Sequence, residues 1–81
     1  MRVILADDHQ LVRQGLRGLL EKAGHVVVGE AADGHEAVKL ARTLVPDIAV
    51  LDLSMPLLNG LDAAREISRL APGIKTILLT M

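Results

Sequence analysis

The sequence predicts a single α/β domain built on a parallel sheet, and three observations support this prediction. Four short runs rich in Val, Ile and Leu are typical of strands, and the segments between them repeat apolar residues at helical spacing. The runs are mostly continuous rather than alternating, as in parallel strands that are covered on both faces. Strands that alternate with helices favour right-handed crossovers within one sheet.

The four predicted strands are short and rich in Val, Ile and Leu. They are residues 2–6 (RVILA), 25–32 (HVVVGEAA), 47–53 (DIAVLDL) and 74–80 (IKTILLT).

Three helices are predicted between these strands. The first carries one apolar stripe and stops at Gly24. The stripe consists of Val12, Leu16, Leu19, Leu20 and Ala23. The second helix starts at Asp33-Gly34 and stops before Pro46, and the third starts near Gly60 and stops before Pro72.

Composition narrows the class of protein. The chain has 81 residues, 51% of them hydrophobic, with a formal net charge of −1, so we expect one small domain with a modest core. It has no cysteine, which excludes disulfides and thiolate metal sites. The apolar runs are too short to span a membrane, so membrane insertion is not expected. Positive and negative charges are interspersed, so strong nucleic-acid binding is not expected either. The first residues show no signal-peptide pattern, so a cytoplasmic location is the default expectation.

Acidic residues follow two of the predicted strands. Asp7 and Asp8 come directly after the first strand, and Asp52 lies near the end of the third. Ligands bind open parallel sheets outside the carboxyl ends of the strands, so three carboxylates meet there if these two strands are neighbours. Each close pair then costs on the order of 3 kcal/mol, which a hard cation such as Mg²⁺ would offset. A carboxylate beside such a metal can also attack phosphorus as a nucleophile.

Simpler interpretations exist for each of these residues. Asp7 and Asp8 could cap the following helix, because acids are favourable at a helix N-terminus. Asp52 could belong to an ordinary turn at the end of a strand. Thr80 could be a plain β-branched strand residue.

The motifs together resemble the receiver domain of bacterial two-component response regulators, closest to the subfamily with a helix-turn-helix output domain. The resemblance rests on "ILADDH" (4–9), "DIAVLDLSMPLLNGLD" (47–62) and "TILLT" (76–80), and it covers the entire chain. It implies a flavodoxin-like, doubly wound parallel sheet with strand order 2-1-3-4.

The resemblance also implies roles for individual residues. Asp52 would be the phosphoacceptor and Thr80 the switch hydroxyl. Mg²⁺ would be held by Asp8, Asp52 and the backbone carbonyl of Ser54, with Asp7 acting through a metal-bound water. Met55-Pro56 would shape the loop beside the acceptor. A histidine kinase would be the partner, and the first helix would be the surface it touches.

The chain departs from the family pattern at its end. After the fourth strand the family continues with a helix, a fifth strand ending in lysine and a last helix, so residues 1–81 correspond to the N-terminal part of a receiver domain. Lys75 is no substitute for that lysine, because it starts the fourth strand at the opposite end of the sheet. DNA binding would need an output domain that the chain lacks. The uncovered fourth strand predicts a homodimer or a domain swap.

Three functions are considered. The first is a phosphoacceptor module, which is not an enzyme in the usual sense, and the second is a non-phosphorylatable interaction or dimerisation domain with the same fold. The third is a metal-dependent phosphatase with an aspartyl nucleophile. It is the weakest, because such enzymes usually carry a second Asp where this chain has Ser54.

Structural or surface positions are expected for the three histidines of the chain and for the two arginines of the predicted first helix. His9, His25 and His35 are scattered without metal-ligand spacing and are expected to be structural or exposed. Arg13 and Arg17 lie one helical turn apart and are expected on a solvated face.

Overall fold

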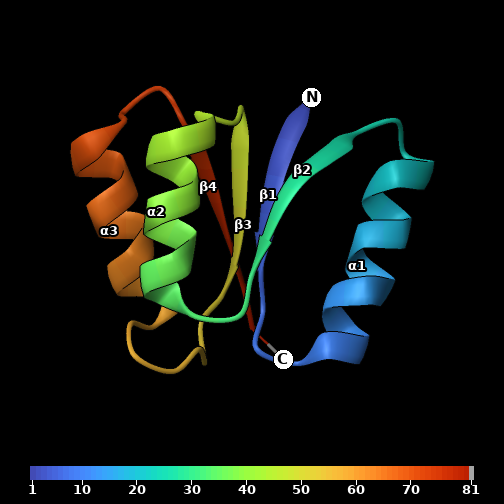
Figure 1. Cartoon of the computed structure of the whole chain (residues 1–81), viewed down its shortest axis with the longest axis horizontal. Helices are drawn as coiled ribbons and strands as arrows, with labels where there is room; N and C mark the ends of the chain where they lie inside the picture. Colours follow the sequence, from blue (N-terminus) through green and yellow to red (C-terminus); the bar gives the residue numbers. More distant parts are fainter. Residues whose placement is uncertain (81) are drawn as a thin grey trace.

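The computed structural model describes residues 1–80 and contains a four-stranded parallel sheet in the order β2-β1-β3-β4 (Figure 1). The elements in chain order are β1 (Arg2–Ala6), α1 (Gln10–Lys22), β2 (Val26–Ala31), α2 (Gly34–Leu44), β3 (Ile48–Asp52), α3 (Gly60–Leu70) and β4 (Lys75–Leu79). The alternation and the strand order confirm the predicted fold class. Strand β1 has the predicted bounds, and each other strand begins and ends one residue inside its predicted range.

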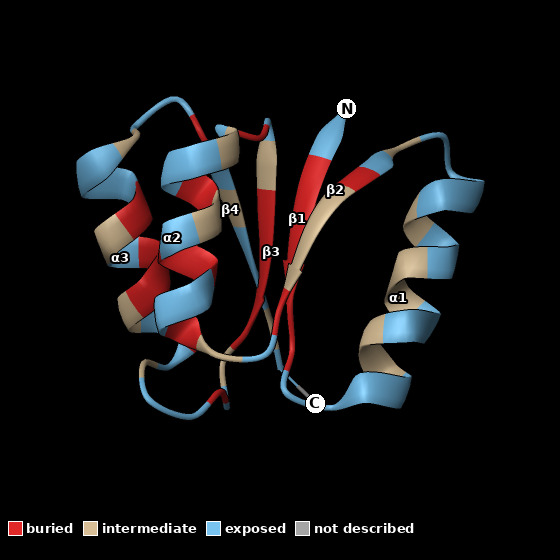
Figure 2. Cartoon of the chain, in the orientation of Figure 1, coloured by how far each residue is buried: buried red, intermediate tan, exposed pale blue. Residues whose placement is uncertain are grey.

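Helices cover both faces of the sheet. Among residues 1–80, α2 and α3 lie together on one face of the sheet, and α1 lies on the other (Figure 1). The larger apolar cluster joins α2 and α3 to the sheet, and the smaller one lies under α1. The buried members of the smaller cluster are Val3, Leu5, Val27 and Val50. The central strands β1 and β3 are therefore buried on both faces, as their continuous apolar sequences indicated (Figure 2).

The apolar stripe predicted for the first helix is only partly buried. Val12, Leu16 and Leu20 are half-buried, whereas Leu19 is 67% exposed and Ala23 is exposed. Within residues 1–80, α1 packs on β1 and β2 at one side of the sheet, which leaves part of the stripe without a surface to cover (Figure 2). The helical period was predicted correctly, but the width of the buried face was not.

The register of the strands places the ends of β1, β3 and β4 side by side. Ala6 pairs with Leu51, and Asp52 pairs with Leu79. Lys75 pairs with Ile48 at the other end of the sheet, as the sequence predicted. The residues that follow β1 and β4 therefore lie at the same edge of the sheet as Asp52.

Within residues 1–80, the helices are all too short or too polar to span a membrane.

Candidate functional site

Four side chains form a cluster at the carboxyl ends of β1 and β3, which we call the acidic cluster. Asp7, Asp8, His9 and Asp52 each offer one ligand atom, and these atoms lie within 4.8 Å of one another. Asp7 is 1% exposed and Asp52 is 2% exposed, whereas Asp8 and His9 are exposed. The convergence predicted from the three acids is confirmed, because β1 and β3 are neighbours in the sheet.

Two carboxylate oxygens of the acidic cluster are buried without a hydrogen-bond partner among residues 1–80. They are Oδ2 of Asp7 and Oδ2 of Asp52. The opposite oxygens are satisfied: Oδ1 of Asp7 accepts from the His9 amide at 2.8 Å, and Oδ1 of Asp52 accepts from the Ser54 amide at 3.3 Å. A buried acceptor without a donor costs about 1–3 kcal/mol, and more when it is charged. These two oxygens fit a cationic ligand that the protein itself does not supply.

Helix capping does not account for the two adjacent acids. The N-cap residue of α1 is His9, and its side chain makes no capping hydrogen bond to the described residues. The Asp7 carboxylate instead accepts from the amide of His9 itself, which precedes the first turn of α1. Asp7 thus organises the loop that leads into the helix and leaves its second oxygen to the cluster.

His9 belongs to the acidic cluster, which the sequence interpretation missed. Its Nδ1 lies 3.1 Å from Oδ1 of Asp7 and 3.0 Å from Oδ1 of Asp8. His9 is exposed, as expected, and it also lies beside Asp7 and Asp8. The spacing between the histidines does not indicate that His9 lies in the cluster. Its position directly after two acids at the end of a strand does.

The other predicted site residues lie at the same edge of the sheet. Ser54 is exposed and is tied to Asp52 through its amide. Thr80 is exposed and comes one residue after Leu79, the residue that pairs with Asp52.

The loop after Asp52 is fixed at both ends. Met55 is buried in the larger apolar cluster, so the first half of the loop is anchored to the core. Asn59 caps α3, because its Oδ1 accepts from the Asp62 amide at 2.9 Å. The loop between them is therefore anchored on both sides, while the role of Met55-Pro56 beside Asp52 stays a prediction.

A cavity of about 550 Å³ lies at the opposite end of the sheet from the acidic cluster. It is lined mostly by apolar residues, with Asp47 and Lys75 among the lining residues. It offers no convergent set of carboxylates within the described residues, so its size does not make it the chemical centre.

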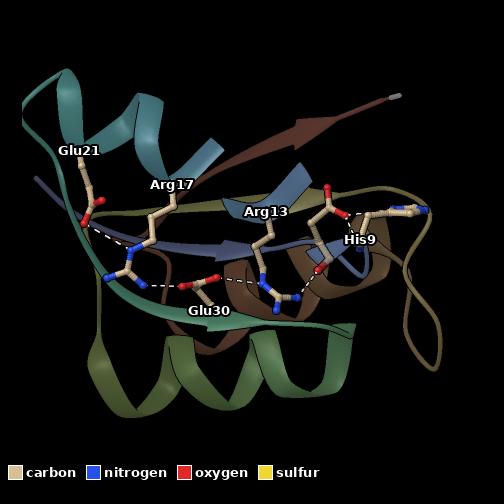
Figure 3. Close-up of polar contacts among 6 residues, drawn as sticks. His9, Arg13, Arg17, Glu21 and Glu30 are labelled. Carbon is tan, nitrogen blue, oxygen red and sulfur yellow. Dashed lines mark hydrogen bonds and ion pairs between the residues drawn. The ribbon is translucent and has the colours of Figure 1, made fainter. Parts of the chain in front are cut away.

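Arg13 and Arg17 were expected on a solvated face; this is wrong for Arg13, whereas the Arg17 side chain is 41% exposed. Arg13 is only 19% exposed, and its Nε donates to Oε1 of Glu30 on β2 at 2.9 Å. Arg17 donates through Nη1 to Oε2 of the same carboxylate, and through Nε to Glu21 at 3.3 Å (Figure 3). Glu30 lies in β2 whereas both arginines lie in α1, so these ion pairs are seen only in the folded structure.

The Glu30 carboxylate, which both arginines share, makes the free energy of unfolding depend on pH. Hydrogen bonds from Arg17 and, less strongly, from Arg13 hold the pKa of Glu30 below its usual value, against the opposing effect of burial. A lowered folded-state pKa stabilises the fold above the unfolded-state value of 4.5, and this contribution is lost as the pH falls through the folded-state pKa. We expect Glu30→Gln to lower the free energy of unfolding at pH 7 by up to about 1 kcal/mol, and the difference to vanish in acid. Urea unfolding followed by far-ultraviolet circular dichroism measures this difference in the free energy of unfolding. An equal loss of stability at pH 7 and in acid would contradict the ion-pair assignment.

The fold and the acidic cluster define a class of protein. The family model for the response regulator receiver domain matches residues 3–81. The chain therefore belongs to the response regulator receiver domain family of two-component systems. Receiver domains are phosphoacceptors rather than classical enzymes, generally bind Mg²⁺ at an acidic pocket, and interact with histidine kinases and phosphatases.

Three known proteins illustrate the relationship. Response regulator UvrY of Escherichia coli (strain K12) is 48% identical over 82 residues, which is all of this chain and 38% of UvrY. A LuxR-family two-component response regulator from an Aurantimonas species superposes with a TM-score of 0.93 at 43% identity, covering 99% of this chain and 58% of that one. The complex of CheX and CheY with BeF₃ and Mg²⁺ from Borrelia burgdorferi matches with a TM-score of 0.94 at 26% identity, covering 99% and 61%. This chain thus spans less than two thirds of each of these relatives.

Proposed function

We propose that Asp52 accepts a phosphoryl group from the phosphohistidine of a histidine kinase, in a Mg²⁺-dependent transfer. The observation that carries the proposal is a pair of buried carboxylate oxygens, on Asp7 and Asp52 of the acidic cluster, that have no hydrogen-bond partner among residues 1–80. Such a pair is costly unless a cation is bound, and a carboxylate beside a cation is suited to attack phosphorus.

The donor set fits Mg²⁺, which prefers oxygen ligands and usually keeps several waters. In this proposal Asp8, Asp52 and the backbone carbonyl of Ser54 hold the ion, and Asp7 holds it through a water molecule. The two buried aspartates have little access to bulk water, so they gain most from a cation in the cluster. When bound, Mg²⁺ would offset negative charge on the transferring phosphoryl group.

The residues of the chain supply the rest of the proposed chemistry. One Asp52 carboxylate oxygen forms a bond to phosphorus while the bond from phosphorus to the kinase histidine nitrogen breaks. When the other ring nitrogen of that histidine carries a proton, the histidine leaves as a neutral imidazole, and Asp52 becomes an acyl phosphate. Thr80 then provides the hydroxyl that turns toward the phosphoryl group, a role supported by its position one residue beyond the partner of Asp52 in β4.

The role of the whole protein is also a proposal. We take residues 1–81 as the N-terminal part of a receiver domain in a cytoplasmic response regulator. Regulation of transcription is supported by the similarity to UvrY and to a LuxR-family regulator. DNA would be bound only through an output domain outside these residues.

The proposal is tested by phosphorylating the protein, expressed at its natural length, with acetyl phosphate and Mg²⁺ and measuring the intact mass. We expect an adduct of one phosphoryl group that is absent in Asp52→Asn. Asp62→Asn is the matched control, because it removes one exposed aspartate charge from α3 outside the acidic cluster and should leave the adduct unchanged. A protein that stays unmodified under these conditions would favour the alternative, a non-phosphorylatable interaction domain with the receiver fold.

We also propose that the 81-residue chain forms a homodimer or a domain-swapped dimer through β4. Among residues 1–80, β4 pairs with β3 alone, and Ile77 on it is 42% exposed. An apolar sheet edge of this kind pairs readily with another chain. Sedimentation at tens of micromolar should show the dimer, and Ile77→Lys should shift it toward monomer because a charge at the edge opposes pairing. A clean monomer of the unmodified chain would refute this interface.

A further inference from the structure

We propose that Arg13 is a positioning residue that holds the acidic cluster in shape through the backbone carbonyl of Asp7. Its Nη1 donates to that carbonyl oxygen at 2.7 Å, while its Nε donates to Glu30. One guanidinium thus connects the edge strand β2 to the loop that carries the first three members of the cluster (Figure 3).

The Asp7 backbone is fixed on both sides by these contacts. Its amide donates to the carbonyl of Ala31 at the end of β2, at 3.0 Å. Its carbonyl lies beyond the last residue of β1 and before the first residue of α1, where regular ladder and helix bonds are not expected. Arg13 supplies the donor that this carbonyl needs, so the position of the Asp7 carboxylate depends on Arg13.

Glu30 holds the Arg13 guanidinium in the orientation that reaches the Asp7 carbonyl. It accepts from Arg13 with one oxygen and from Arg17 with the other, and Arg17 is held in turn by Glu21. The planar fork of Arg13 can bond to Glu30 and to the Asp7 carbonyl at the same time. A lysine has one nitrogen at the end of a flexible stem and cannot reproduce this fork.

A positioning role for Arg13 and the repulsion between its charge and Mg²⁺ predict opposite changes in Mg²⁺ affinity when Arg13 is replaced. A cation on α1 disfavours binding of Mg²⁺ to the nearby acids, so removal of an arginine charge should strengthen Mg²⁺ binding. Loss of the support for Asp7 should weaken it, because groups that orient ligands commonly contribute about 10- to 100-fold in metal affinity. The direction of the change therefore separates the two effects.

Arg17 provides the matched control. It lies one turn further along α1, carries the same charge and binds the same carboxylate, but its hydrogen bonds go to Glu30 and Glu21 rather than to the loop. Calorimetric titration with Mg²⁺ should show affinity reduced about tenfold in Arg13→Met and unchanged or slightly increased in Arg17→Met. Arg13→Lys, which keeps the charge, should also bind more weakly, and it replaces Arg13→Met if that variant fails to fold.

A second measurement does not depend on the ion. The His9 amide donates to Asp7, so its hydrogen exchange, followed by NMR without Mg²⁺, reports on the loop directly. We expect exchange about tenfold faster in Arg13→Met or Arg13→Lys than in Arg17→Met, with the Ala71 amide at the end of α3 unchanged.

The Mg²⁺ titration rests on the proposed function, and the two measurements can fail separately. If the unmodified protein binds no Mg²⁺, the proposed function fails while the exchange experiment still decides the role of Arg13. If Arg13→Met binds Mg²⁺ as tightly as Arg17→Met, or if His9 exchange is equal in the two variants, Arg13 is not a positioning residue.

Discussion

The Gly60→Ala variant is expected to lose most of its folded population. A Cβ at this position would lie 2.2 Å from the backbone oxygen of Asp52 and 2.7 Å from its carbonyl carbon. Both are backbone atoms, so no flexible side chain can move aside. Separating α3 from the end of β3 should cost about 3 kcal/mol or more, a large part of the stability of a domain of this size. Urea unfolding followed by circular dichroism measures the loss.

Gly15→Ala is the matched control for this variant. Gly15 lies inside α1, and a Cβ there would meet no atom of residues 1–80 within 4 Å. Alanine is the better helix former, so this variant should gain up to about 1 kcal/mol. A folded Gly60→Ala protein of normal stability would mean that α3 does not approach Asp52 as closely as described.

Mg²⁺ is expected to raise the melting temperature of the protein by more than about 10 °C. The acidic cluster places like charges within 4.8 Å, two of them buried, and a cation bound only by the folded state removes this repulsion. At 100 times its dissociation constant, such a ligand stabilises the fold by about 2.7 kcal/mol. In a domain of this size, 1 kcal/mol corresponds to about 4–8 °C.

Two controls separate site binding from general ionic effects. Sodium chloride at equal ionic strength should give only a small shift, because screening acts weakly on buried charges. Asp52→Asn should melt at a higher temperature than the unmodified protein without Mg²⁺ and should respond much less to the ion. A melting curve that Mg²⁺ leaves unchanged would contradict the proposed cation site.

The amino-acid sequence by itself determined the order of the elements and the edge of the sheet at which the site lies. Continuous Val, Ile and Leu runs that alternate with helical patterns are typical of parallel strands covered on both faces, and this made the parallel α/β class predictable. The convergence of Asp7 and Asp52 was predictable because strand-end acids in a parallel sheet share one edge. These properties depend on local pattern and on chain direction, which a sequence contains.

Only the tertiary structure decided which side chains meet across the sheet. The pairing of Arg13 with Glu30 joins residues 17 apart in sequence, and it depends on the packing of α1 against β2. The exposure of Leu19 likewise depends on how much of α1 finds a surface to cover. Such contacts are set by the distances between packed elements, and helical spacing along the chain does not specify those distances.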